Sequence, residues 1–303
     1  MARVARRTKF MKHIETRMAR HCAILILLSP EQPRETLLGV GSGVLLNIGT
    51  DYFVLTVAHV AKAIEQHRPF GRIFFVELGL DDSLVVKNFS GAEFVYPEAS
   101  RENIVDVCAI RLSPDDLSKS DRDRFLPLSS VSLEESSDRF VLLGLPLTNS
   151  ESEVQAPNSV RTVAVPLCYR TTPYRRKPPK ENFDKGAHFL LKEKRGKTLL
   201  TGRDAIRSFK SKSSFDELPR LNGMSGCGVW KRNDKDTSVL NGLEFGLRLV
   251  GIQQSALHGK YVKCTKIGFV LRCIYKRYPN LPDPMGFFKR DPSGLIKLTD
   301  EWR

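Results

Sequence analysis

The sequence predicts an all-β fold made of two barrels. Short apolar runs separated by turn residues recur along residues 23–114 and again along 138–275, which is the spacing typical of all-β barrels. The stretch between them, 115–137, is rich in Asp and Ser and has no apolar period, so we expect a surface connection there. With 303 residues, the chain is long enough for two such lobes with a sizeable core.

The first predicted barrel begins with apolar runs at 23–28, 37–48 and 52–57. A turn at 47–51 (NIGTD) joins the second and third runs into a hairpin, and one or two helical turns are expected at 60–67. Further short strands are predicted at 73–78, 84–89, 93–96 and 107–112. The hairpin therefore delivers His59 at a strand end, and Asp106 stands at the start of the last strand.

Strands of the second predicted barrel lie at 140–143, 160–167, 188–191, 227–230, 247–252 and 267–270. Three prolines within 169–186 indicate an exposed loop. A short amphipathic helix is predicted within 5–20 and another helix over 270–278. The resulting division is a basic N-terminal extension (1–22), the first barrel (23–114), the linker (115–137), the second barrel (138–275) with a basic insertion (170–212), and a C-terminal tail (276–303).

The candidate nucleophile is Ser225, which stands between glycines in the stretch 223–230 (GMSGCGVW). A hydroxyl on such a tight turn can attack a carbonyl carbon, while the N–H groups of Gly223 and Ser225 point to where an oxyanion would form. Gly/Ser turns are also common at the start of strands without any catalytic role. The motif therefore needs support from other residues.

That support comes from His59 and Asp106, which give the chain order His, Asp, Ser. A histidine at a strand end and an aspartate that caps a turn also have purely structural interpretations, and Asp81 and Asp82 are rivals to Asp106 that lack a following apolar strand. A hydrolase elbow of the Gly-x-Ser-x-Gly type places its histidine after the serine. Only His258 follows Ser225, so that alternative fits poorly.

These pieces resemble the chymotrypsin/trypsin-like serine peptidases, especially the bacterial trypsin-like and HtrA-type branch. The resemblance covers about residues 24–275 and is carried, in the family's order, by 41–46 (GSGVLL), 56–60 (TVAHV), 106–112 (DVCAIRL), 143–146 (LGLP), 223–230, 250–252 (VGI) and 267–269 (IGF). It implies two packed antiparallel six-stranded β-barrels with a short N-terminal helix and a C-terminal helix and tail. It also implies a serine endopeptidase that needs no metal or other cofactor, with Ser225 as nucleophile, His59 as general base and Asp106 as the orienting acid.

Two residues depart from the family pattern. Met224 stands where digestive members carry an aspartate that pairs with a freed N-terminus, so activation by that route is not expected. Cys227 replaces the usual second glycine and is expected to crowd the strand that leaves the nucleophile.

The resemblance also places a substrate pocket at Pro219, Asn222, Gln254, Ser255 and Ala256. Pro219, six residues before the serine, offers no carboxylate, which argues for a neutral residue before the cleaved bond rather than Arg or Lys. A shifted loop that brings Asp216 or Glu217 to this position remains an alternative.

The net charge of +14 is concentrated in two segments. Residues 1–20 hold seven Lys/Arg against one acid, and residues 170–212 hold fourteen against four, so the remainder is slightly negative. These segments are candidate contacts for an acidic partner, although a solvated basic face explains them equally well. A catalytically silent peptide-binding scaffold and a nucleic-acid-associated protein are the alternatives to an enzyme.

The six cysteines show no metal-ligand spacing, and the N-terminal region has neither a secretory signal nor an apolar run of membrane-spanning length. We therefore expect a cytoplasmic protein with reduced cysteines.

Overall fold

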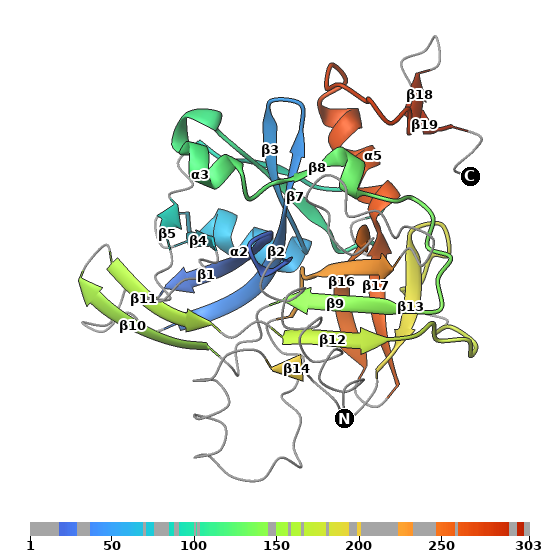
Figure 1. The fold of residues 1–303 in the computed structure, drawn as a ribbon, viewed down its shortest axis with the longest axis horizontal. Helices are drawn as coiled ribbons and strands as arrows, with labels where there is room; N and C mark the ends of the chain where they lie inside the picture. Colours follow the sequence, from blue (N-terminus) through green and yellow to red (C-terminus); the bar gives the residue numbers. More distant parts are fainter. Residues whose placement is uncertain are drawn as a thin grey trace, which may run out of the picture.

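The fold is described from a computed structural model (Figure 1). The described residues are 18–28, 37–68, 71–75, 85–87, 91–99, 101, 104–144, 150–156, 159–164, 167–179, 182–193, 199–200, 224–232, 247–257, 260–290 and 296–299. This part of the chain is mostly β-structure in antiparallel sheets, with few helices. The expected closure into two six-stranded barrels stays a prediction.

The first large sheet has eight strands in the order β5-β4-β1-β2-β3-β7-β6, with β8 parallel to β2. Their bounds are β1 Cys22–Leu28, β2 Leu37–Ile48, β3 Asp51–Thr56, β4 Gly71–Phe75, β5 Val85–Lys87, β6 Glu93–Val95, β7 Cys108–Leu112 and β8 Leu126–Pro127. The predicted turn between β2 and β3 is confirmed. Gly49 adopts a positive φ of 66° there, and the Asn47 side chain donates to the carbonyls of Gly49 (2.9 Å) and Asp51 (3.2 Å).

The second large sheet has seven strands in the order β13-β17-β16-β15-β9-β12-β14. Their bounds are β9 Phe140–Gly144, β12 Leu167–Thr171, β13 His188–Lys192, β14 Leu199–Leu200, β15 Gly228–Arg232, β16 Leu247–Leu257 and β17 Tyr261–Lys266. Two separate two-stranded ribbons are formed by β10 (Ser150–Ala156) with β11 (Ser159–Ala164) and by β18 (Phe288–Arg290) with β19 (Ile296–Leu298).

Each large sheet buries both of its faces. Because successive side chains of a strand point to opposite faces, Val54 of β3 packs in a core enclosed by the first sheet, while Phe53 and Leu55 pack in a core shared with the second sheet. In β15, Val229 packs in the second sheet's own core, and Trp230 in the shared core. This double burial explains why the strands have nearly continuous apolar sequences.

The helices are α2 (Ala58–Gln66), α3 (Lys119–Arg122) and α5 (Ile267–Arg277), with short 3-10 turns at Pro114–Asp116 and Leu128–Ser130. The predicted strand at 267–270 is wrong: α5 already begins at Ile267. Its buried side chains include Ile267, Val270, Leu271 and Ile274, which follow the helical period and fill the shared core. The first 17 residues, which hold most of the predicted N-terminal helix, lie outside the described residues.

The predicted linker 115–137 contains α3 and β8 rather than loop alone. Leu117, Phe125, Leu126 and Leu128 are buried in it, so the connection packs against the first sheet and the shared core. Among the described residues, no helix is long and apolar enough to cross a membrane. Five described cysteines are free thiols: Cys22, Cys108, Cys227, Cys264 and Cys273.

Candidate active site

His59 lies in the first turn of α2, directly after the strand β3. The apolar residues Ala58, Ala61 and Ile64 bury one face of this helix, which leaves the neighbouring position 59 to project outward. The His59 side chain is 56% exposed. Its position follows from the short connection, since only Val57 separates the end of β3 from the start of α2.

Asp106 holds His59 by two hydrogen bonds. Its Oδ2 lies 2.6 Å from Nδ1 of the imidazole, and its Oδ1 accepts a hydrogen bond from the backbone N of His59 at 2.9 Å. Buried Val105 and Val107 flank Asp106 and fix its backbone before β7. A carboxylate at Nδ1 keeps the proton on that nitrogen of the neutral ring, so Nε2 remains free to accept another proton.

The negative charge of Asp106 is stabilised by its neighbours. Partial burial disfavours the negative charge, but the hydrogen bond and charge interaction with His59, together with the backbone N–H groups of His59 and Ala58, outweigh it. The pKa of Asp106 is therefore lowered from its usual value. At neutral pH the pair holds a carboxylate next to the imidazole.

Ser225 sits on a tight turn that is fixed by backbone hydrogen bonds. Ser42 N donates to the carbonyl of Ser225 at 2.8 Å, and the next residue, Gly226, donates to Gln253 O at 2.9 Å. Gly226 has φ of +90°, and a Cβ added there would lie 2.0 Å from Ser42 O and 2.4 Å from Thr56 Oγ1. The turn therefore requires glycine at this position for both its conformation and its space.

The same contacts bring the Ser225 turn to the strand end that carries His59. Ser42 is the residue that holds Ser225, and its carbonyl accepts a hydrogen bond from Thr56 Oγ1 at 2.8 Å. Thr56 ends β3, three residues before His59. The neighbouring Gly41 packs so closely on Val60 that an added Cβ would lie 2.7 Å from its side chain. His59 and Asp106 are thus joined directly, and Ser225 is joined to them through Ser42 and Thr56.

The side chain of Cys227 packs against Gly144. Its Cβ lies 2.4 Å from where a Cβ at Gly144 would be, so Gly144 of β9 supplies the space that the extra side chain needs. The thiol donates to Gln253 Oε1 at 3.2 Å. Full burial raises the pKa of Cys227 well above the ordinary value, which keeps the thiol neutral and gives it a packing role.

The predicted substrate-pocket residues are only partly visible. Pro219, Asn222 and the oxyanion residue Gly223 lie outside the described residues, as do Asp81 and Asp82. Ser255 and Ala256 are exposed on the last part of β16. Gln254, expected beside them, is only 6% exposed. The register of β16 on β17 shifts between Gln253 and Ser255. Both faces of the second sheet are covered, so Gln253 and Gln254 are both buried, Gln253 against Cys227 and Gln254 beside His188 and Lys263.

Gln254 joins a buried polar cluster that sequence reasoning did not identify. The side-chain oxygen of Gln254 faces two hydrogen-bond donors, Asp106 N at 3.3 Å and Lys263 Nζ at 3.2 Å, and accepts from both. The side-chain nitrogen of Gln254 lies 3.1 Å from His188 Nε2. Burial, followed by the charge of Lys263, lowers the pKa of His188 to about 4, so this imidazole is neutral. The pKa of Lys263 is lowered by burial and partly restored by Asp106. Through the hydrogen bond from Asp106 N to Gln254, the cluster fixes the backbone of Asp106.

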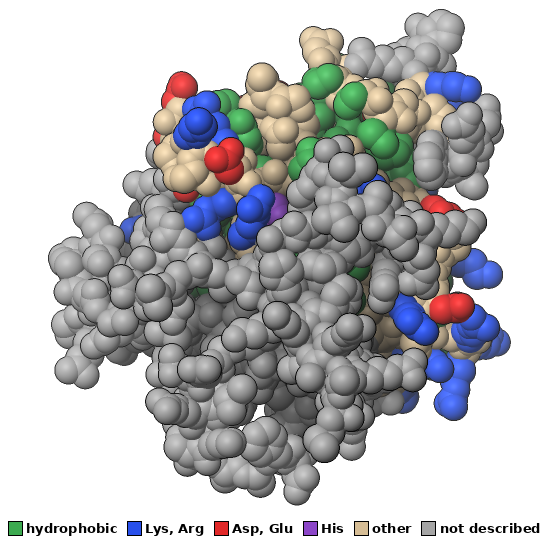
Figure 2. Space-filling model, in the orientation of Figure 1, with side chains coloured by type: hydrophobic (Ala, Val, Ile, Leu, Met, Phe, Trp, Pro, Cys, Tyr) green, Lys and Arg blue, Asp and Glu red, His purple; other side chains and the backbone are tan. Residues whose placement is uncertain are grey.

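Exposed basic side chains occur in more than one place. The loop between β12 and β13 carries exposed Arg175, Arg176 and Lys177, and Figure 2 shows Lys/Arg side chains at the right-hand edge of the molecule and others beside a histidine at the upper left of its centre. Within the described residues, no group of three or more His, Cys, Asp or Glu side chains is arranged to hold a metal ion.

Comparisons with known proteins leave the family open. No protein-family model matches the sequence, and no curated protein shows significant sequence similarity to it. Among solved structures, the fold is similar to the crystal structure of tobacco vein mottling virus protease, with 10% sequence identity and a TM-score of 0.35 over 82% of this chain and 77% of that chain.

Proposed function

We propose that this protein is a serine endopeptidase of the chymotrypsin/trypsin-like kind. The observation that carries the proposal is the double contact between His59 and Asp106, at 2.6 Å through the imidazole and 2.9 Å through the backbone. A histidine that is held through Nδ1 and whose side chain is 56% exposed is suited to move a proton to and from a substrate. The turn of Ser225, which requires Gly226 and is hydrogen-bonded through Ser42 to the end of β3, supports Ser225 as the nucleophile that this histidine would serve.

The proposed reaction has two halves. In the first, Ser225 Oγ attacks the peptide carbonyl carbon while His59 Nε2 takes the hydroxyl proton, and the same proton passes to the leaving amine as the C–N bond breaks. In the second, water attacks the acyl-enzyme, His59 again takes a proton, and Ser225 Oγ leaves with it. Asp106 keeps the imidazole oriented and stabilises the imidazolium that forms in each half.

The oxyanion is expected to be held by the N–H groups of Gly223 and Ser225. The primary pocket is expected to accept a neutral residue, and Ser255 and Ala256 are the described residues whose exposure suits contact with a peptide. No cofactor takes part in the proposed mechanism.

Hydrolysis of a peptide library with Ser225→Ala beside wild type tests the proposal. The variant is expected to lower kcat by about 10⁴ to 10⁶ with an unchanged circular dichroism spectrum. Ser120→Ala is the matched control, because it removes an exposed hydroxyl from α3, outside the proposed site, and is expected to retain the wild-type kcat within about threefold. Equal hydrolysis by wild type and Ser225→Ala would exclude Ser225 as the nucleophile, and no hydrolysis by either would favour a peptide-binding scaffold.

A further inference from the structure

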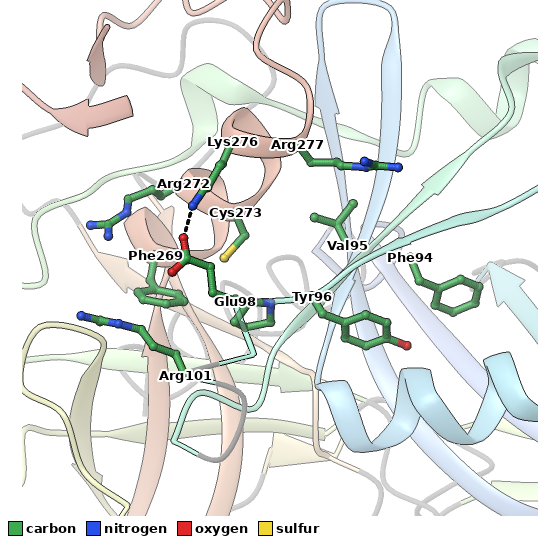
Figure 3. A pocket seen from close by; sticks show the side chains of 11 residues that line it. Phe94, Val95, Tyr96, Glu98, Arg101, Phe269, Arg272, Cys273, Lys276 and Arg277 are labelled. Atoms are coloured by element: carbon green, nitrogen blue, oxygen red, sulfur yellow. Dashed lines mark hydrogen bonds and ion pairs between the residues drawn. The ribbon is translucent and has the colours of Figure 1, made fainter. Parts of the chain in front are cut away.

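A pocket separate from the candidate active site lies between α5 and the segment that follows β6 (Figure 3). Its volume is about 340 Å³, and none of His59, Asp106 and Ser225 lines it. Ligand pockets commonly have volumes of about 300 to 1,000 Å³ and occur preferentially where structural units meet. This volume is suited to one or two side chains of a peptide rather than to a large cofactor.

One stripe of α5 forms the first wall. Phe269, Cys273 and Lys276 stand at positions i, i+4 and i+7 and therefore share a face of the helix, while the opposite face, with Val270 and Leu271, is buried in the shared core. Figure 3 shows Phe269, Cys273 and Lys276 along this face, opposite the segment with Tyr96 and Glu98. One face of α5 thus packs in the shared core, and another face lines the pocket.

The apolar lining that faces α5 comes from Phe269, Val95, Pro97 and Cys273. Phe269 lies under the guanidinium of Arg101 at 5.9 Å. The rings of Phe94 and Tyr96 point away from α5, and Tyr96 Oη donates to Glu65 of α2 at 2.7 Å, so these two residues border the pocket without offering it their rings. An aromatic or branched side chain would bury its surface against Phe269 and Val95.

The rim of the pocket is strongly basic. Arg101, Arg272, Lys276 and Arg277 line it together with a single carboxylate, that of Glu98. Glu98 pairs with Lys276, and both side chains are 57% exposed. An exposed ion pair of this kind contributes little to stability. A carboxylate from another molecule can therefore replace Glu98 at low cost while it gains the other cations.

We propose that this pocket binds an acidic peptide segment of a partner protein, with an aromatic or branched side chain against Phe269 and Val95 and flanking Asp or Glu side chains on the basic rim. Charge complementarity and the apolar lining argue together for a ligand that has both features. The occupant would contact the chain segment that carries the orienting acid, because Arg101 O accepts hydrogen bonds from Ile104 N (3.0 Å) and Val105 N (2.8 Å), next to Asp106.

Fluorescence anisotropy with a labelled peptide, Gly-Asp-Phe-Asp-Asp-Gly, tests this proposal on the full chain. All proteins carry Ser225→Ala, so that hydrolysis of the peptide cannot contribute and the result does not depend on the proposed activity. The double variant Arg272→Glu/Arg277→Glu is expected to raise Kd at least about tenfold, since two attractive contacts become repulsive. The matched control is Lys119→Glu/Lys260→Glu, which changes net charge equally at exposed positions away from the pocket and is expected to stay within about threefold.

A second variant addresses the cavity without changing charge. Cys273→Phe fills the space between α5 and the segment that follows β6, and it is expected to weaken binding by at least about fivefold with an unchanged circular dichroism spectrum. A peptide with Gly in place of Phe is expected to bind wild type at least about fivefold more weakly. Equal weakening by both charge-reversal doubles would overturn the proposal, as would equal binding of the Phe and Gly peptides. An oligonucleotide of the same charge that displaces the peptide and binds more tightly would also overturn it, in favour of a nucleic acid.

Discussion

Gly226 gives a sharp test of how the Ser225 turn is built. Alanine at this position meets two separate obstacles: a φ of +90°, and a Cβ 2.0 Å from Ser42 O and 2.4 Å from Thr56 Oγ1. The first costs about 1–2 kcal/mol, as for other residues with a Cβ in left-handed backbone. The second forces backbone to move, which adds about 1–3 kcal/mol of overpacking. Each lost hydrogen bond, such as that from Ser42 N to Ser225 O, adds about 1 kcal/mol.

The chain offers a matched control in Gly286. It also has a positive φ, 62°, but an added Cβ there has no atom within 4 Å. Gly286→Ala therefore meets only the conformational cost of about 1–2 kcal/mol. Gly226→Ala is expected to lower the free energy of unfolding by about 3–6 kcal/mol in total, so the difference between the two variants isolates the effect of crowding.

Urea unfolding followed by the fluorescence of buried Trp230 measures both values. Labelling by a fluorophosphonate probe reports the site separately, and we expect Gly226→Ala to lose labelling and Gly286→Ala to retain it. If Gly226→Ala were no more than about 1 kcal/mol less stable than Gly286→Ala, the described packing of the turn against Ser42 and Thr56 would be refuted.

Three further predictions concern catalysis, pH and charge. Asp106→Asn should lower kcat by about 10⁴, the magnitude known for this role in a digestive protease. If Asp82→Asn caused that loss and Asp106→Asn did not, Asp82 would be the orienting acid. The pKa values of buried His21 and His188 are lowered to about 4, mainly by burial, so the unfolded chain takes up more protons below about pH 6.5. The free energy of unfolding should therefore be highest above that pH and fall toward pH 4, with a loss of about 2 kcal/mol per histidine at pH 5. Urea unfolding at pH 7.5 and pH 5 measures this loss, and His21→Asn is expected to show about half of the loss seen in wild type. A loss as large in His21→Asn as in wild type would contradict these pKa values. Replacing basic residues 175–177 by Gln should reduce kcat/KM on an acidic protein substrate mainly at low salt, and equal loss on a small chromogenic ester would instead place this loop in the active site.

The strands and the histidine–aspartate pair could be predicted because their signals are local. A turn such as 47–51 fixes the β2–β3 hairpin, and the apolar run before His59 and the one after Asp106 mark the strand ends that bring them together. The helix α5 was partly misassigned because Ile267–Val270 is an apolar run too short to show a period. Only the contacts with the shared core reveal its helical spacing.

The buried position of Gln254 could not be predicted for a different reason. Successive side chains of β16 point to opposite faces of a sheet that is covered on both, so Gln254 is buried as well as Gln253. The groups that meet Gln254 include His188 and the backbone N of Asp106, which are distant from it in sequence, so the polar cluster has no signal in β16 alone. The pocket beside α5 likewise depends on packing between residues 94–101 and 269–277.

The central claim is that Ser225 is a nucleophile activated by His59. The most direct measurement is reaction of the full chain with a fluorophosphonate probe, followed by mass spectrometry of the proteolysed adduct. We expect the phosphonyl group on Ser225 in wild type, and labelling slower by at least about 10³-fold in His59→Ala, because the hydroxyl loses its base. A wild-type protein that stays unmodified, or one modified at another serine at the same rate with and without His59, would contradict the claim.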